Sequence, residues 1–347
     1  MSAAHRFTDT TSIRMVWPFL VPATRHGRDL SAVAARFGLT RAQLENRETR
    51  VPTRLIAEIL REAIECSGER DLGLLAARWV DATHFGVCEY LPRARATLRA
   101  AIEDTNRYMP LMVGGFGHAL ERHGAHVIAR MWFSPDLEMH EAAYEFAVAA
   151  GVLRARRIAR DETLAPVEIH FMHARPPSTE RHEALFRCPI HFGCESTQVV
   201  MRADSLELQM PAAEPALAEL LVQQAETMLE NLPRGDLRSR VLALLGGEVA
   251  LREASVKHVA RRVGVSVRNL SRRLADEGTT YRELVDRVRK QAALSDLSRG
   301  TKSITEIADA LGFSSSQSFH RAFRRWTGTT ADRHRRRLRE QRQHDSA

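Results

Sequence analysis

The sequence predicts an α+β domain followed by an all-α domain that contains two helix-turn-helix units joined by a long helix. Three observations support this fold class. The 347 residues suffice for two domains, and 44% apolar with 27% charged residues suits folded cores with a solvated surface. Helical and alternating apolar spacings are mixed over residues 12–212. Two segments near the C-terminus repeat one apolar pattern.

The first domain is expected over residues 12–230. Residues 12–105 are predicted to be mostly helical, because apolar side chains such as Ile59, Leu60, Ala63 and Ile64 recur at helical spacing. The predicted elements that follow are a hairpin turning at His123-Gly124, a helix over 142–158, and strands over 166–173, 198–201 and 205–210. These elements predict an antiparallel sheet flanked by helices.

A further helix is predicted from Pro215, with Leu217, Leu220 and Leu221 among its apolar residues. Its apolar side could pair with a second copy of the chain or pack on its own domain, and the sequence leaves both alternatives open. A run of turn-forming residues follows, so a linker is expected at 231–236 and a second domain over 237–340.

The repeat in the second domain defines two helix-turn-helix units, over 255–276 and 303–326. The first helix of each unit places four apolar residues on one face, and the second set lies 48 positions after the first. These residues are Val256, Val259, Ala260 and Val263, and then Ile304, Ile307, Ala308 and Leu311. Gly264 and Gly312 are expected to end these helices in the left-handed conformation. Ser266 and Ser314 are expected to cap the next helices.

The second helix of each unit is predicted to have an apolar inner face and a polar, cationic outer face. The residues expected inside are Val267, Leu270 and Leu274 in the first unit, and Phe319, Phe323 and Trp326 in the second. Between the units, apolar residues from Tyr281 to Leu297 predict one long helix. Such a helix would set a fixed spacing between the two outer faces.

The positive charge of the chain is confined to its C-terminal part. Residues 251–347 contain 22 Lys and Arg against 11 Asp and Glu, whereas the preceding residues contain 29 against 32. Basic residues lie within the predicted helices as well as in the terminal run, so a solvated basic tail does not account for them all. This distribution predicts a surface that binds nucleic acid.

Two helix-turn-helix units in a basic domain predict binding of double-stranded DNA through adjacent major grooves. Arg can pair with guanine and Asn or Gln with adenine, whereas residues near a helix start can hold phosphate. The residues expected to contact bases are Arg268, Asn269, Arg272, Gln317, His320 and Arg321. Those expected to contact phosphate are Ser266, Arg273, Ser316 and Arg324.

Residues 255–337 resemble the DNA-binding domain of the arabinose-regulator (AraC/XylS) family. The motifs that carry the resemblance are Val259-Ala260-x-x-Val263-Gly264-Val265-Ser266, Leu270-Ser271-Arg272-Arg273-Leu274, Ile304-x-x-Ile307-Ala308-x-x-Leu311-Gly312-Phe313 and Phe319-x-x-x-Phe323-Arg324-Arg325-Trp326-x-Gly328. One departure is that Thr329-Thr330-Ala331 stands where the family usually has a proline. A final helix is still expected over Asp332 to Arg335.

The upstream half resembles the effector-binding domain of one branch of this family, which lacks the cupin-like arm. The carrying motifs are Leu72-Gly73-Leu74, His84-Phe85-Gly86, Tyr90, Thr97-Leu98, Tyr108, Arg175-Pro176 and Phe186-x-Cys188-Pro189-Ile190-x-Phe192. The resemblance implies a cytoplasmic transcription regulator, with activator as its expected class, that binds promoter DNA and a small-molecule effector. It also implies a homodimer that acts with RNA polymerase.

No catalytic residue, cofactor or membrane segment is predicted. His170, His173, Cys188, His191 and Cys194 have metal-like spacing, but two histidines three apart on a strand would face opposite sides, so no metal site is expected. Two rival functions remain open. One is an enzyme or DNA-repair domain fused to a DNA-binding tail, and the other is a non-specific architectural DNA protein. The sequence identifies neither the effector nor the operator.

Overall fold

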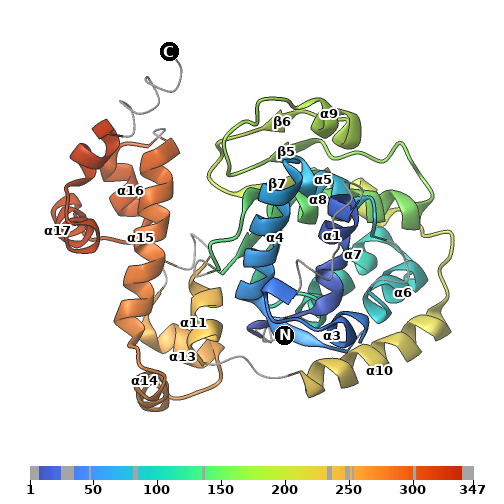
Figure 1. The fold of residues 1–347 in the computed structure, drawn as a ribbon, viewed down its shortest axis with the longest axis horizontal. Coiled ribbons are helices and arrows are strands. Elements are labelled where there is room, and N and C mark those ends of the chain that lie inside the picture. Colours follow the sequence, from blue (N-terminus) through green and yellow to red (C-terminus); the bar gives the residue numbers. More distant parts are fainter. Residues whose placement is uncertain are drawn as a thin grey trace. The chain divides into compact units, whose positions relative to one another are not determined.

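The computed structural model describes residues 8–24, 35–46, 48–80, 85–134, 137–232, 237–246, 251, 254–299 and 302–337. The chain divides into two compact units, His5–Gly235 and Asp236–Ala347. Most of the predicted linker, residues 233–236, lies outside the described residues. Figure 1 shows the elements of each unit in chain order. Within the residues that the structure describes, we find no helix long and apolar enough to cross a bilayer.

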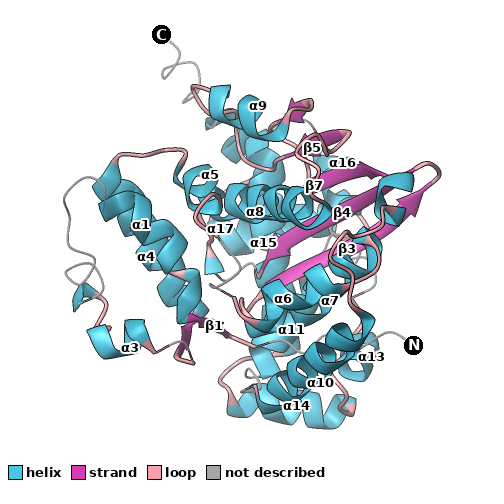
Figure 2. Cartoon of the chain, turned by 90° about the vertical axis from the view of Figure 1, so that its right-hand side faces the viewer, coloured by secondary structure: helices cyan, strands magenta, loops and turns pink. Residues whose placement is uncertain are grey.

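The N-terminal unit is built on a five-stranded sheet with the order β3-β4-β7-β5-β6 (Figure 2). The strands are β3 (Phe116–His123), β4 (His126–Phe133), β5 (Glu168–His170), β6 (Ile190–His191) and β7 (Thr197–Arg202). β3 and β4 form the predicted hairpin, and their register pairs His123 with His126. All neighbours are antiparallel except β5 and β6. The predicted α+β class is therefore confirmed.

One face of the sheet packs on the long helix α8 (Glu141–Ala159) and forms the main core. Directly paired residues share a face, so Ile169, Val199 and Ala129 lie together on this side. Ile169 is fully buried there. Phe146 of α8 belongs to the same cluster. The alternate residues of the strands point to the opposite face of the sheet.

The other elements of the N-terminal unit complete this core and two smaller ones. They are β1 (Thr10–Ser12), η1 (Ile13–Met15), α1 (Trp17–Thr24), α3 (Arg41–Glu45), β2 (Arg50–Pro52), α4 (Thr53–Ser67), α5 (Leu72–Ala77), α6 (Val87–Ala94), α7 (Leu98–Tyr108), η2 (Met109–Leu111), α9 (Glu180–Phe186), η4 (Asp204–Glu207) and α10 (Pro215–Asn231). Helices α5 and α8 approach closely at Gly73, where an added Cβ would lie 2.2 Å from the Ala142 carbonyl oxygen. The glycine therefore permits this contact.

Two predicted strands differ from the structure. The strand expected over 166–173 is regular only over Glu168–His170. The strand expected over 205–210 is wrong, because its first part is the 3-10 helix η4. The buried apolar residues there, Leu206 and Met210, are four positions apart, and Leu208 between them is exposed. The segment then bonds to the start of α7 rather than to a strand, through Leu98 N–H to the Leu208 carbonyl at 3.0 Å.

The described residues of the C-terminal unit form helices and the turns between them, as predicted. Its helices are α11 (Leu237–Leu245), α13 (Val256–Arg262), α14 (Val267–Asp276), α15 (Tyr281–Arg299), α16 (Ile304–Ala310) and α17 (Ser316–Thr327), followed by helical residues 331–337. The predicted connector is confirmed as the single helix α15. The final helix forms although threonines replace the proline that is usual in the family, and Ala331 is fully buried in the core of the unit.

Candidate nucleic-acid interface and effector cavity

The two helix-turn-helix units share one backbone device at the turn. Gly264 and Gly312 have φ values of 74° and 71°, which residues other than glycine rarely adopt. The N–H of the next residue bonds back to the first helix in each unit. Val265 donates to the Ala260 carbonyl and Phe313 to the Ala308 carbonyl, both at 2.9 Å. The predicted role of the glycines as helix stops is thus confirmed.

The turn of the second unit is one residue longer than that of the first. Ser266 is the N-cap of α14, and its hydroxyl accepts the Asn269 N–H at 3.2 Å, as predicted. The predicted cap Ser314 is wrong, because Ser315 caps α17 by accepting the Ser318 N–H at 3.2 Å. Ser314 and Ser315 both follow Gly312 closely enough to cap α17, so the spacing in the sequence does not decide between them. The two second helices are therefore offset by 49 positions rather than 48 (Ser266 to Ser315).

Helix α14 buries Leu270 and Leu274 completely, as predicted. Val267, also predicted to face inward, is 37% exposed. It is the first residue of the helix, and its spacing of three from Leu270 does not ensure that another element packs over it. Arg268 and Arg272 are exposed, whereas Asn269 and Arg273 are half-buried. Arg272 also donates to the Asn269 side-chain oxygen at 3.2 Å. This face presents guanidinium and amide donors together.

Helix α17 buries Phe319 and Phe323 completely and Trp326 partly. Its exposed face carries Gln317, Arg321 and Arg324, and half-buried Ser316 and His320 border it. With the offset of 49, Arg321 occupies the helix position of Arg272, and Gln317 that of Arg268. Ser316 corresponds to Val267 and is the first residue of the helix rather than its cap. The predicted contact residues of each helix thus gather on one solvent-facing side.

The connector α15 holds the second unit through Arg289. Its Nε donates to the Leu311 carbonyl at 2.9 Å and its Nη2 to the Gly312 carbonyl at 3.2 Å. The guanidinium also lies 4.7 Å from the centre of the Phe313 ring. Arg325 of α17 adds an ion pair to Asp286 at 2.8 Å. These contacts fix α16 and α17 to the connector.

The first unit is fastened to α11 instead. Both carboxylate oxygens of Glu277 accept N–H groups at the start of α11, from Leu237 at 3.0 Å and Arg238 at 2.8 Å. Arg240 donates to the Val263 carbonyl at 2.6 Å. In Figure 1, α14 lies near one end of α15 and α17 near the other. A 19-residue helix is about 28 Å long, which is close to the rise of one turn of DNA.

The N-terminal unit contains a cavity of about 230 Å³ between α8, α7 and the sheet. Most of the side chains that line it are aliphatic or aromatic, as in many small-molecule sites. The lining includes Phe116, Met131 and Val199 from the strands and Ala147 from α8. Sequence reasoning had identified no pocket residue, because the lining is assembled from segments far apart in the chain.

Few polar side chains border the cavity, and one of them belongs to a buried ion pair. Arg154 on α8 is 9% exposed and pairs with Glu89 on α6, which is 1% exposed. Its Nε donates to Glu89 Oε1 at 2.8 Å. Asn106 and His118 supply further polar atoms at the lining. The cavity therefore suits a mainly apolar ligand with a small number of polar groups.

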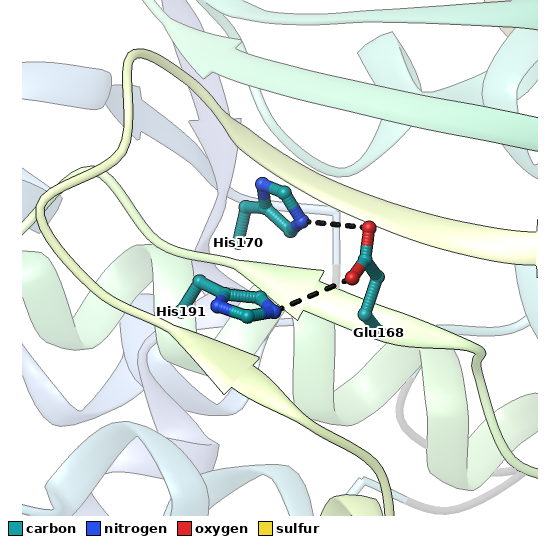
Figure 3. Close-up of side chains that lie close together, drawn as sticks. All are labelled: Glu168, His170 and His191. Carbon is teal, nitrogen blue, oxygen red and sulfur yellow. Dashed lines mark ion pairs between the residues drawn. The ribbon is translucent and has the colours of Figure 1, made fainter.

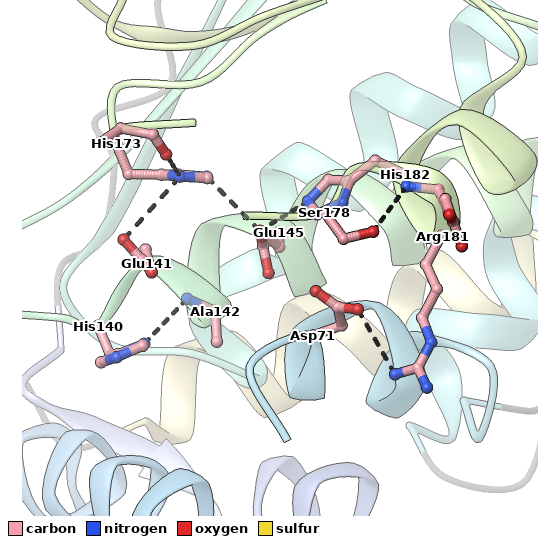
Figure 4. A network of polar contacts seen from close by, with 11 residues as sticks. Asp71, His140, Glu141, Ala142, Glu145, His173, Ser178, Arg181 and His182 are labelled. Carbon is pink, nitrogen blue, oxygen red and sulfur yellow. Dashed lines mark hydrogen bonds and ion pairs between the residues drawn. The ribbon is translucent and has the colours of Figure 1, made fainter. Parts of the chain in front are cut away.

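The five His and Cys residues with metal-like spacing do not form one cluster. His173 lies near Glu145, with His173 Nε2 3.7 Å from Glu145 Oε1, and fully buried His182 bonds the same oxygen at 2.7 Å (Figure 4). Burial raises the pKa of the Cys188 thiol to about 11, so this sulfur is protonated at neutral pH and is a poor nucleophile. Cys194 forms no disulfide.

His170 and His191, by contrast, are brought together on neighbouring strands, with Glu168 beside them (Figure 3). Glu168 is not among the residues predicted from the sequence. Its position two residues before His170 on a strand could have indicated a shared face.

Two family descriptions match the chain. Residues 27–210 match the arabinose-binding N-terminal domain of the AraC transcription regulator, and residues 259–337 match a helix-turn-helix domain. The chain is 29% identical to the ornithine utilization regulator of Pseudomonas aeruginosa over 75% of this chain and 77% of that protein. It is 25% identical to the transcriptional regulator VirS of Mycobacterium tuberculosis over 76% of this chain and 78% of VirS. The crystal structure of the transcriptional regulator CdpR from Pseudomonas aeruginosa aligns with a TM-score of 0.42 and 26% identity, covering 91% of this chain and 97% of CdpR.

Proposed function

This chain belongs to the AraC family of transcriptional regulators, and we propose that it reads a specific promoter sequence with α14 and α17 under the control of a small molecule. The observation that carries the proposal is the pair of matched exposed faces. We call α14 and α17 the recognition helices. Each follows a turn with a left-handed glycine and presents exposed guanidinium groups on the side opposite its fully buried apolar residues. An ordinary helical hairpin needs no such pair of cationic faces.

Within these faces we assign base contacts and phosphate contacts by exposure and position. The residues proposed to contact base edges are Arg268, Asn269, Arg272, Gln317, His320 and Arg321. Those proposed to contact phosphate are Ser266, Arg273, Ser316 and Arg324. Ser266 and Ser316 lie at helix starts, where unpaired N–H groups attract phosphate.

The test is a selection of duplexes from a random library by the full-length protein, followed by Arg268→Ala. The selected sites should contain two short conserved blocks about one helical turn apart. Arg268→Ala should lose about 1–3 kcal/mol of binding free energy, concentrated at one base pair. Arg324→Ala is the comparison, since loss of a phosphate contact should weaken all sequences alike. A protein that selects no common sequence would be an architectural DNA binder instead.

The effector is proposed to occupy the cavity beside α8, and its binding to shift the population between arrangements of the two units. The mainly apolar lining favours a ligand with a large apolar part. A thermal-shift screen of metabolites should find a compound that raises the melting temperature of the full chain. Ala147→Phe, which fills the cavity, should abolish that rise and leave DNA binding unchanged. A rise that persists in this variant would place the effector elsewhere.

We further propose that α10 mediates self-association. Leu217 is 45% exposed and Leu220 is 64% exposed, whereas Ala218, Ala225 and Leu229 on the same helix are buried. Leu220→Glu should therefore convert a dimer to a monomer in light scattering, whereas Glu219→Gln, at an exposed position about 100° around the helix from Leu220, should not. A wild-type protein that is monomeric at micromolar concentration would exclude this interface.

As a regulator of transcription, the protein is proposed to act in the cytoplasm together with RNA polymerase and without catalysis of its own. The half-buried, protonated thiol of Cys188 gives no support to a repair enzyme. Transcription in vitro from a selected promoter should rise when the protein and its effector are added. Protein that neither raises nor lowers the transcript level would contradict a role at the promoter.

A further inference from the structure

A cluster of two histidines and one glutamate lies on the sheet face opposite the main core. In the register of β5 with β7, Glu168 pairs with Val200 and His170 with Gln198, so their side chains alternate with buried Ile169. The parallel register of β5 with β6 pairs His170 with His191. The pleat of the sheet therefore directs all three side chains to one side, as Figure 3 shows.

The three side chains turn their ligand atoms toward one another. Glu168 Oε1 lies 3.0 Å from His170 Nε2, and Glu168 Oε2 lies 3.3 Å from His191 Nε2. One ligand atom from each residue can be chosen so that all lie within 4.8 Å of one another. Two ligands on a tetrahedral zinc ion, each about 2.0–2.1 Å from the metal, are roughly 3.3 Å apart. Only small side-chain movements are needed to reach that geometry.

A neighbouring amide can set which nitrogen of the His170 ring carries the proton. The Gln198 amide nitrogen lies 3.1 Å from His170 Nδ1. When this amide is turned by 180°, its oxygen accepts the Nδ1 proton and leaves the Nε2 lone pair for a metal. Metal-binding histidines usually have such a partner.

We propose that Glu168, His170 and His191 form a binding site for a divalent transition-metal ion of the zinc type. Two imidazoles and one carboxylate suit such ions better than Ca²⁺ or Mg²⁺, which prefer ligand sets made of oxygen. Three protein ligands leave at least one position for water or another ligand. The ion would tie β6, the last strand of the sheet, to β5 and so hold the segment that contains α9.

The competing interpretation is that Glu168 simply forms ion pairs with two protonated histidines. The interpretations differ in one respect: a metal requires both Nε2 atoms as lone-pair donors and displaces their protons. His191 is 50% exposed at its side chain, so His191→Gln should not disturb the fold. His126→Gln on β4 is a matched control, because His126 is also an exposed strand histidine outside the cluster.

The experiment is equilibrium dialysis of the metal-stripped full chain against ZnCl₂ at pH 7.5, with Co²⁺ absorption as a second readout. We expect the wild type and His126→Gln to bind the ion with equal affinity in a site that gives the Co²⁺ d–d bands of nitrogen and oxygen ligation. His170→Gln, His191→Gln and Glu168→Gln should each weaken this binding at least tenfold. The same metal should raise the melting temperature of the wild type but not that of His191→Gln.

Failure to bind Zn²⁺, or an affinity that the three cluster variants leave unchanged, would overturn the proposal. An equal loss in His126→Gln would do so as well, because it would show that scattered histidines bind the ion. None of these results bears on DNA binding, which depends on the other unit.

Discussion

The two helix-turn-helix units share the left-handed glycine and the backward hydrogen bond at the turn but differ in what holds them together. In the first unit the inner side is aliphatic, with Leu270 and Leu274 fully buried, and the unit is fastened to α11. In the second the inner side is aromatic. The Phe313 and Phe319 rings pack edge to face with centroids 5.6 Å apart, and the unit is fastened to α15 by Arg289.

The geometry of the turn and the packing that stabilises each unit are therefore determined by different residues. A glycine in the left-handed conformation and one backward hydrogen bond define the angle of the turn in both units. The packing behind the recognition helix and the partner helix are free to differ. Stability should therefore respond differently in the two units, whereas the mode of DNA contact should be the same.

The largest expected effect is a loss of stability when a buried side chain behind one of the two recognition helices is truncated. Phe323→Ala removes a fully buried ring and should destabilise the second unit by about 3–5 kcal/mol, because a cavity remains. The matched Leu274→Ala in the first unit should lose about 2–5 kcal/mol. Hydrogen exchange of peptides from α17 and α14 measures each unit separately. If Phe323→Ala opened α14 as much as α17, the two units would be one cooperative body.

The next effect concerns the fastening of the second unit. Arg289→Ala leaves the Leu311 carbonyl without its charged donor and removes the contact with the Phe313 ring, so a loss of about 1–3 kcal/mol is expected. Arg289→Lys should not restore it, because one ammonium cannot donate in the planar fork geometry. Hydrogen exchange should increase in α16 and α17 only. An increase in α13 of the same size would show that α15 supports both units.

The smallest effect is a pH dependence confined to the second unit. Glu306 accepts the Ser303 N–H at 2.7 Å, and this bond lowers its pKa in the folded state. A lowered folded-state pKa gives stability that is present above the unfolded-state value of about 4.3 and is lost as pH falls through the folded value. The corresponding residue of α13 is His258, and no carboxylate caps that helix.

Glu306→Gln keeps the capping geometry and removes only the charge. Hydrogen exchange in α16 should therefore be faster in the variant than in the wild type at pH 7, and the two rates should converge near pH 3. A difference that stays constant across this range would show that the charge contributes nothing through this bond.

The sequence predicted the repeated turn well because its determinants are local. Gly264, Gly312 and the small Ala260 and Ala308 act within a few residues of their own positions. The same locality explains why a longer turn was missed at Ser314, since either of two adjacent serines could cap α17.

Features that depend on distant partners could not be predicted. The cavity lining and the pairing of β5 with β6 arise only when separate segments meet. His170 and His191 are 21 positions apart, and their contact is created by strand register rather than by spacing in the sequence. The strand expected at 205–210 was wrong for the same reason, because its hydrogen-bond partner is the start of α7.

The most direct test of the account compares Arg272→Ala with Arg321→Ala in duplex selection by the full-length protein. These residues occupy the same position in α14 and α17 and are both exposed. We expect each variant to relax the preference at one base pair, and the two base pairs to lie in different blocks about 10 base pairs apart. Relaxation of the same base pair by both variants, or a uniform loss on all sequences, would contradict two matched recognition helices.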